Sequence, residues 1–441
     1  MSTTDRGETW RALSPDLTRN DPATEGPTGG PIELDQTSAE TYPYISALAA
    51  SPLNRNLLWA GSSDGLVHVT TDHGAHWRTI TPRAVPQYAE ISSIEPSHTA
   101  QGTAYLTAQR YMWDDFHPYL YRTTDYGAHW MQLTNGIPSD EYVYVVRQDP
   151  QQSNVLFAGT RNTVRVSFNG GASWRPLTLN LPGVQVRDIA IDSREGQVAV
   201  ATHGRAFWIL DNLTVLEQLA RSNDATSALF APQTAWLTHM AGGGEYPRSD
   251  SGQNPPFGAT VFFTLPAGYS GATPASLSFS DSRGHMIRTF ILHPKQPGQA
   301  LTAEMRESMS PAQIKAAADS AATAVAAGAN HFQWDLRYPD ATEVNGFYVP
   351  SAAGGENDFP IGPQVVPGTY WVTLRYGGKT VTKPFTVALD PNLHSKHGAL
   401  AARFSLQMQI RNTLDEMDRA INTAIAARDR IPDGARKFAL N

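Results

Sequence analysis

One eight-residue pattern, repeated four times, constrains the fold of this chain more than any other feature of its sequence. The pattern reads Ser/Thr-x-Asp/Asn-x-Gly-x-x-Trp, and it occupies residues 3–10, 70–77, 123–130 and 167–174. Its acidic or amide positions follow one another after 67, 53 and 44 residues. A repeat at such a period indicates one supersecondary unit that the chain uses several times.

Each copy of the pattern predicts a tight turn between two short apolar strands. An Asp or Asn side chain can accept hydrogen bonds from backbone N–H groups about two residues further on and so hold the turn. The Gly permits a positive φ angle, and the Trp can pack over the hairpin. The pattern is therefore explained as structure, without any chemistry. The residues assigned this structural role are Asp5, Asp72, Asp125 and Asn169.

The strands around these turns predict a β-propeller. Short apolar strands separated by turn residues at even spacing are typical of propeller blades. Whole blades are predicted at residues 45–80, 91–133 and 142–177, and a fourth set of strands at 186–210 lacks the pattern. With the turn at 3–10, the chain holds about four to five blades.

The first copy of the pattern has no inner strands before it, so we expect an N-terminally truncated first blade. An unclosed propeller leaves an unpaired sheet edge, which promotes pairing with other chains. The expected partner at the open edge is a missing N-terminal propeller portion or another chain.

The second half of the sequence has a different organisation. Residues 1–217 are predicted as propeller and 218–256 as a linker. Strands with period-two alternation at 257–390 indicate an immunoglobulin-like or fibronectin-like β-sandwich, with a helical insert near 310–327. Residues 391–441 form a helical tail, in which apolar residues 410, 414, 417, 421 and 424 predict a face that docks on another element.

Composition excludes several classes of function. The chain has 34 Lys and Arg against 41 Asp and Glu, a formal charge of −7, so no nucleic-acid partner is expected. It has no Cys, which removes thiolate nucleophiles and Cys-based zinc sites. No metal or cofactor motif is present. No run of about 18 apolar residues predicts a membrane span, and residues 1–5 show no signal peptide.

The repeated pattern resembles the Asp-box, or bacterial neuraminidase repeat, of sialidases, two-propeller xyloglucanases and the sortilin luminal domain. The whole layout, with residues 203–211 reading His-Gly-Arg-Ala-Phe-Trp-Ile-Leu-Asp, is similar to bacterial proteins loosely described as glycosyl hydrolases or sortilin-domain proteins. The resemblance implies a mainly β fold: a partial propeller, then an immunoglobulin-like sandwich and a C-terminal α-helix. It also implies a secreted or periplasmic protein, but no particular activity.

Propeller geometry places the candidate ligand-binding residues. The Asp-box turns lie on one face, while the loops from second to third strands, and from each blade to the next, lie on the opposite face. Propellers bind ligands there. The loop at 111–119 offers aromatic rings that can stack on a sugar or a side chain. The candidates on this face are Tyr111, Trp113, His117, Arg161, Arg187, His203 and Arg205.

Four carboxylates on the same face are candidate catalytic residues. A glycosidase needs two carboxylates on either side of the bond it cleaves. The candidates are Asp114, Asp115, Glu90 and Glu141.

Two functions stay open on this evidence. The first is a binding or scaffold module that recognises a glycan or a peptide. The second is an endo-glucanase-like glycoside hydrolase that needs a second propeller. A sialidase is disfavoured, because an arginine in a blade loop, such as Arg187, ordinarily pairs with a local carboxylate such as Asp188 or Asp211.

Overall fold

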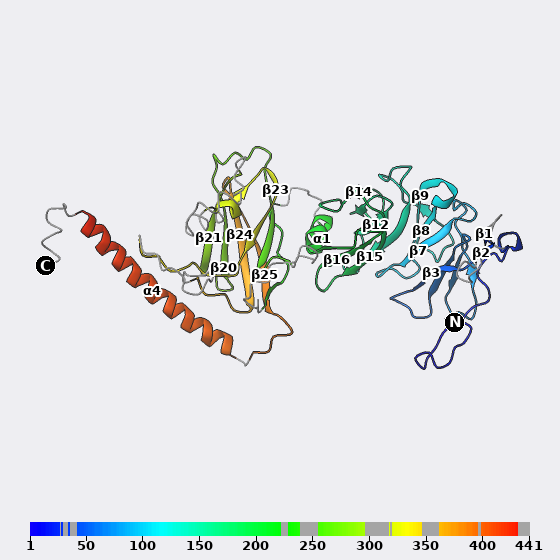
Figure 1. The fold of residues 1–441 in the computed structure, drawn as a ribbon, viewed down its shortest axis with the longest axis horizontal. Helices are drawn as coiled ribbons and strands as arrows, with labels where there is room; N and C mark the ends of the chain where they lie inside the picture. Colours follow the sequence, from blue (N-terminus) through cyan, green and yellow to red (C-terminus); the bar gives the residue numbers. More distant parts are fainter. Residues whose placement is uncertain are drawn as a thin grey trace. The chain divides into compact units, whose positions relative to one another are not determined.

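The structure is a computed structural model, and it divides into two compact units, Met1–Asn223 and Asp224–Asn441 (Figure 1). The fold is mainly β: a partial propeller is followed by a β-sandwich and a C-terminal helix. The described residues are 1–26, 28–29, 34–35, 42–221, 228–238, 255–295, 317, 320–345, 361–395 and 398–430.

Four antiparallel sheets in chain order form unit 1, and we call them blades 1 to 4. Blade 1 contains β3 (Ile45–Ala50), β4 (Leu58–Ser62), β5 (Val67–Thr70) and β6 (Arg78–Thr79). Blade 2 contains β7 (Glu90–Pro96), β8 (Ala104–Arg110), β9 (Asp115–Thr123) and β10 (Met131–Gln132). Blade 3 contains β11 (Val143–Gln148), β12 (Leu156–Thr160), β13 (Val164–Ser167) and β14 (Arg175–Pro176). Blade 4 contains β15 (Val186–Asp192), β16 (Gln197–Thr202) and β17 (Phe207–Leu210). Figure 1 shows the sheets following one another from blue to green.

Two short strands, two 3₁₀ turns and one helix also belong to unit 1. The two-stranded pair β1 (Thr28–Gly29) and β2 (Leu34–Asp35) lies before blade 1, and the 3₁₀ turn η1 spans Pro22–Thr24. A second 3₁₀ turn, η2 (Tyr111–Trp113), joins β8 to β9, and helix α1 (Leu213–Arg221) follows blade 4.

Apolar side chains fill the space between successive blades. Ile91 and Val186 lie near the starts of β7 and β15, the first strands of blades 2 and 4, and are fully buried. A side chain at Gly61 of β4 would collide with Ile91, and one at Gly159 of β12 would collide with Val186. Glycine at these two places therefore lets neighbouring blades approach closely.

The repeated pattern forms the same turn in each of its four copies, three of which belong to blades 1, 2 and 3. In blade 2, Thr123 Oγ1 donates to Asp125 Oδ1 at 2.8 Å and accepts from Gly127 N at 2.9 Å. The backbone N–H of His129 donates to Asp125 Oδ1 at 2.9 Å. The bonds from His129 and Thr123 lower the pKa of Asp125 to about 2. Trp130 Nε1 donates to the carbonyl of Ile80 in blade 1 at 2.7 Å, so the turn also joins adjacent blades.

Helix α1 takes the place of the pattern in blade 4. Leu213 N donates to Gly196 O at 2.9 Å, as Gly170 N of blade 3 donates to Asn154 O at 2.9 Å. Leu213 is buried against the cluster between blades 3 and 4. The chain after β17 thus makes the first hydrogen bond of the repeated turn and then continues as a helix.

Two buried carboxyl groups meet beneath α1. Asp149, in the turn after β11, is fully buried, and Glu217 of α1 is nearly so. Burial raises the pKa of both groups, and the negative charge of Asp149 raises the pKa of Glu217 further. Arg221 Nη2 lies 3.3 Å from Glu217 Oε2 and partly offsets this effect.

We expect Glu217→Gln to raise the melting temperature of unit 1 at pH 7 by a few degrees, because it replaces a buried carboxylate with a neutral group of similar shape. A carboxyl whose pKa is raised by folding stabilises the protein below its unfolded pKa. It loses that contribution as the pH rises through the folded pKa. The gain should therefore vanish near pH 4, where Glu217 is protonated. Melting curves from pH 4 to 8 test this, with the exposed Glu195→Gln as control; an equal gain at pH 4 would contradict it.

Unit 2 is a β-sandwich. One sheet orders its strands β18 (Ala235–Leu237), β25 (Lys379–Leu389), β24 (Gly368–Tyr376), β20 (Ala275–Asp281), β21 (Met286–Pro294) and β22 (Ala324–Val325). The other pairs β19 (Ala259–Leu265) with β23 (Gly328–Trp334). The core centres on Trp334 and Phe279, whose rings stack 4.4 Å apart.

The predicted helical insert ends earlier than expected. Residues 317 and 320–322 are helical, but Ala324–Val325 form β22, which pairs in parallel with β21. The helix therefore does not continue to residue 327, because the chain there extends the sheet. The remaining predicted residues, 310–316 and 318–319, lie outside the described part of the chain.

Helix α4 (Ala399–Asp429) packs through a mixed polar and apolar stripe, with the Phe404 and Tyr338 ring centroids 5.3 Å apart, and most of the predicted apolar face is exposed. Asp415 Oδ1 accepts from Thr342 N at 2.8 Å, and Arg411 Nη2 donates to Asp340 O at 2.9 Å. Ile410, Met417 and Ile421 of the predicted face are exposed. The prediction was wrong because sequence periodicity identifies an apolar stripe on a helix but not the element against which the helix packs.

No helix in the described ranges is long and apolar enough to span a membrane.

Candidate ligand-binding face

The β8–β9 connection lies at the end of blade 2 opposite its repeated turn, which joins β9 to β10. It consists of η2 and Asp114, which takes a left-handed conformation with φ 60°. β9 then begins at Asp115, whose register partner is Arg110. Residues 115–119, predicted as loop, are therefore strand, and their side-chain directions are set by the sheet.

A first aromatic stack joins this connection to the loop before blade 2. The rings of Trp113 and Tyr88 lie parallel within 16°, with centroids 6.3 Å apart. The guanidinium carbon of Arg110 lies 5.1 Å from the Trp113 ring centroid, and that of Arg19 lies 5.6 Å from the Tyr88 centroid. Tyr88 also donates to Asp21 Oδ2 at 2.7 Å. Trp113 is nevertheless 61% exposed, so the stack presents aromatic surface to solvent.

A second stack bridges blades 2 and 3. The rings of Tyr111 and Tyr142 stack with centroids 5.2 Å apart, and Phe116 lies 6.2 Å from Tyr142. The Arg161 guanidinium lies 4.6 Å from the centroid of Phe116. These cation–π contacts fix the arginine against the rings.

Residues at the starts of the inner strands converge near Tyr111 of the second stack. The Arg187 guanidinium lies 3.9 Å from the centroid of the Tyr144 ring. Burial raises the pKa of Glu90, although a hydrogen bond from Gln109 and the charge of Arg187 act against it. The charges of both Glu90 and Arg187 also act on Tyr44, which precedes β3. All four blades therefore contribute to one group of polar and aromatic side chains.

The predicted local pairing of Arg187 is not found. Asp188 pairs with Arg147, whose Nη2 lies 2.7 Å from Asp188 Oδ1, and Asp211 accepts from Gln197 at 3.0 Å. Arg187 instead lies over the Tyr144 ring, so Arg187 and Asp188 contact different neighbours in blade 3.

Glu141 is held inside blade 3. Arg165 donates to both of its oxygens, at 2.8 and 2.7 Å, and Thr160 donates to Oε1 at 2.5 Å. Burial acts to raise the pKa of Glu141, but the bonds from Arg165 and Thr160 outweigh it and lower the pKa. This carboxylate is 4% exposed and fully engaged in an ion pair.

Asp115 is also engaged by its neighbours. It accepts from Tyr119 Oη at 2.8 Å, and His117 Nδ1 lies 2.9 Å from its Oδ1. These bonds lower its pKa although burial opposes them. His117 also lines a hollow of about 350 Å³ with Gln132 and Ile137, away from the two stacks.

The other two candidates lie in the turn between β16 and β17. His203 Nδ1 is 3.1 Å from Gln185 Oε1, and Arg205 N donates to Thr202 Oγ1 at 3.2 Å. Both residues are exposed. Sequence reasoning did not single out Tyr44, Tyr142 or Tyr144, although each stands at the start of an inner strand, which was the available signal.

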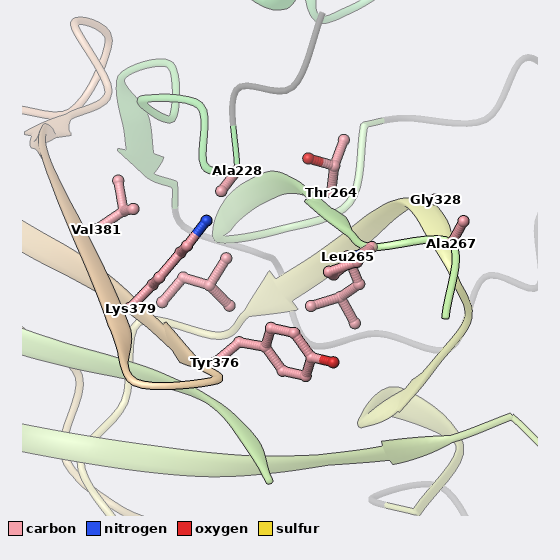
Figure 2. A pocket seen from close by; sticks show the side chains of 10 residues that line it. Ala228, Thr264, Leu265, Ala267, Gly328, Tyr376, Lys379 and Val381 are labelled. Atoms are coloured by element: carbon pink, nitrogen blue, oxygen red, sulfur yellow. The ribbon is translucent and has the colours of Figure 1, made fainter. Parts of the chain in front are cut away.

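A separate hollow of about 440 Å³ lies in unit 2. Figure 2 shows Lys379 and Tyr376, from the β24–β25 hairpin, facing Leu265 and Ala267. Apart from Thr264, the rest of its lining is apolar. In the part of the chain that the structure describes, no group of three His, Cys, Asp or Glu residues is placed to hold a metal ion.

These features define a protein of the β-propeller kind whose loop face carries aromatic and charged side chains. No family model matches the sequence, and no curated protein matches it.

Several solved propellers show some similarity. The GH74 xyloglucanase of Xanthomonas campestris is 15% identical, over 40% of this chain and 30% of that one, with a TM-score of 0.31. YCF48 from Cyanidioschyzon merolae is 19% identical, over 39% and 54%, with a TM-score of 0.29. The GH74 enzyme of Niastella koreensis is 16% identical, over 49% and 27%, with a TM-score of 0.30. The chain thus spans from about a quarter to about half of the length of these proteins.

Proposed function

We propose that unit 1 is a binding module of a secreted or periplasmic multi-domain protein, and that it holds an extended glycan or peptide across the loop face. The observation that carries this proposal is the pair of aromatic stacks, Trp113 with Tyr88 and Tyr111 with Tyr142. Flat rings can stack on the apolar faces of sugars or on side chains. Arg161, Arg187 and Glu90 supply polar contacts that would orient the ligand.

Binding is favoured over hydrolysis by the state of the carboxylates. Glu141 is fully used by Arg165, and Asp115 by Tyr119 and His117. A carboxylate locked in this way is a poor proton donor, because its neighbours stabilise the charged form.

One observation supports glycoside hydrolysis as a second candidate. Burial raises the pKa of Glu90, and a glycosidase requires a carboxyl that stays protonated to serve as the general acid. Its partner carboxylate would be Asp114 or a residue of a second propeller.

We expect Trp113→Ala to weaken ligand binding about 10- to 100-fold, about 1.4–2.7 kcal/mol, since a Trp at the centre of a binding surface is typically a hot spot. A glycan array and a peptide library would identify the ligand. Calorimetry would then measure its dissociation constant for the wild type, for Trp113→Ala and for a control variant. Met131→Ala, an exposed residue of the outer strand β10, is the matched control. Equal affinities for the three proteins would refute a role for this stack.

A polysaccharide panel separates the two candidates. If unit 1 only binds, no polysaccharide releases reducing ends, and Glu90→Gln changes affinity alone. Release of reducing ends that is lost in Glu90→Gln but kept in Asp140→Asn, a change of an exposed carboxylate, would establish the hydrolase instead.

A further inference from the structure

The first strand of blade 1 exposes positions that every other blade buries. Ile45 pairs with Ser62 at the start of a β-bulge, as Val143 pairs with Thr160 and Val186 with Thr202. Val143 and Val186 are fully buried, but Ile45 is 42% exposed. Leu48 of β3 is 67% exposed, whereas the residues at the equivalent register position in blades 2, 3 and 4 are buried. Those residues are Ile94, Val146 and Ile189.

The third strand of blade 4 shows the converse. Phe207 pairs with Ala201 of β16, as Val164 pairs with Gly159 in blade 3 and Val67 with Gly61 in blade 1. Val164 and Val67 are buried, but Phe207 is 77% exposed. Ile209 of β17 is 52% exposed, while the residues in its register position in blades 1 and 3, Val69 and Val166, are buried.

Within unit 1 these two sets of positions form the interfaces between successive blades. Val67 and Val69 of blade 1 share one core cluster with Ile91 and Ile94 of blade 2. Val164 and Val166 of blade 3 share another with Val186 and Ile189 of blade 4. Between neighbouring blades, the third strand of one blade packs on the first strand of the next. The third strand of blade 4 and the first strand of blade 1 both lack such a neighbour, and the two surfaces are complementary. Their exposure means that the two ends of one chain do not cover each other.

The N-terminal residues occupy only the outer part of the exposed side of blade 1. Ser2 and Arg11 form a β-bridge around the first Asp-box turn. Leu13 O accepts from Trp77 Nε1 at 3.1 Å, as Leu133 O accepts from Trp174 Nε1 at 2.8 Å between blades 2 and 3. Residues 2–13 thus stand as an outer strand on blade 1. Blade 4 has three inner strands and, in the described ranges, no outer one.

We propose that two copies of this chain associate head to tail, with blade 4 of each copy packed on blade 1 of the other. Phe207 and Ile209 of one copy would then cover Ile45 and Leu48 of its partner. The partner's residues 2–13 would lie outside the three strands of blade 4. A two-fold axis repeats the contact and closes both ends, which leaves no apolar end exposed.

Sedimentation and light scattering of the full chain test this proposal. We expect a mass of twice the 48.0 kDa of one chain at micromolar concentration. Leu48→Arg and Phe207→Arg should each raise the dissociation constant at least 100-fold, and Met131→Arg should leave it unchanged. Both residues are exposed in the single chain, so circular dichroism should show an unaltered fold.

Mixing the two variants gives the sharper result. A head-to-tail pair of Leu48→Arg with Phe207→Arg keeps one interface entirely native and collects both changes in the other. We therefore expect the mixture to dimerise more tightly than either variant alone. A wild-type monomer at all concentrations, a dimer that survives both single substitutions, or a mixture no tighter than its components would each overturn the proposal.

Discussion

Glu141→Ala is expected to lower the unfolding free energy of unit 1 by about 3–5 kcal/mol, because it leaves the Arg165 charge buried without its partner. The Arg165 side chain is 9% exposed and donates to both oxygens of Glu141. Urea denaturation of the full chain should show the loss. Hydrogen exchange in β12 and β13 would assign it to blade 3. Asp140→Ala changes the adjacent, exposed carboxylate and should cost under about 0.5 kcal/mol.

The double variant Glu141→Leu with Arg165→Met separates lost charge compensation from lost packing. Replacing both ions by apolar residues of similar size is often neutral or stabilising, so most of the stability should return. If the double variant were as unstable as Glu141→Ala, the ion pair would not be the cause. If Glu141→Ala itself were within 1 kcal/mol of wild type, the carboxylate would be available for another role.

Trp174→Ala is expected to cost about 3–5 kcal/mol, because it opens a cavity between blades 2 and 3. This Trp is 4% exposed, packs in the cluster with Leu133 and Leu156, and donates to the Leu133 carbonyl at 2.8 Å.

The matched control is Trp10→Ala, at the same position of the first repeat. Trp10 is 58% exposed and its Nε1 bonds only within its own turn, to Gly7 O at 3.1 Å. We expect a loss below about 1 kcal/mol. Equal losses for the two variants in urea denaturation would mean that the Trp stabilises its own hairpin and not the contact between blades.

The sequence was sufficient for the features that depend on neighbours along the chain. The Asp-box positions and the even spacing of apolar strands predicted the turns, the strands and the mainly β fold, because each turn is closed by bonds within eight residues. The loop that carries Tyr111 and Trp113 was also recognisable, since it interrupts two blade strands.

Only the tertiary structure decided what the charged residues do. Glu90 and Glu141 look alike in the sequence, yet Glu90 is half-buried beside a glutamine and Glu141 is buried and bound by an arginine. That difference depends on which strand lies alongside and on which side of it each residue points. Strand register brings together residues that are about 20 or more positions apart in the sequence. No local sequence pattern predicts which of them will meet. For the same reason, α1 replacing a turn and Arg187 covering Tyr144 became visible only once the blades were packed.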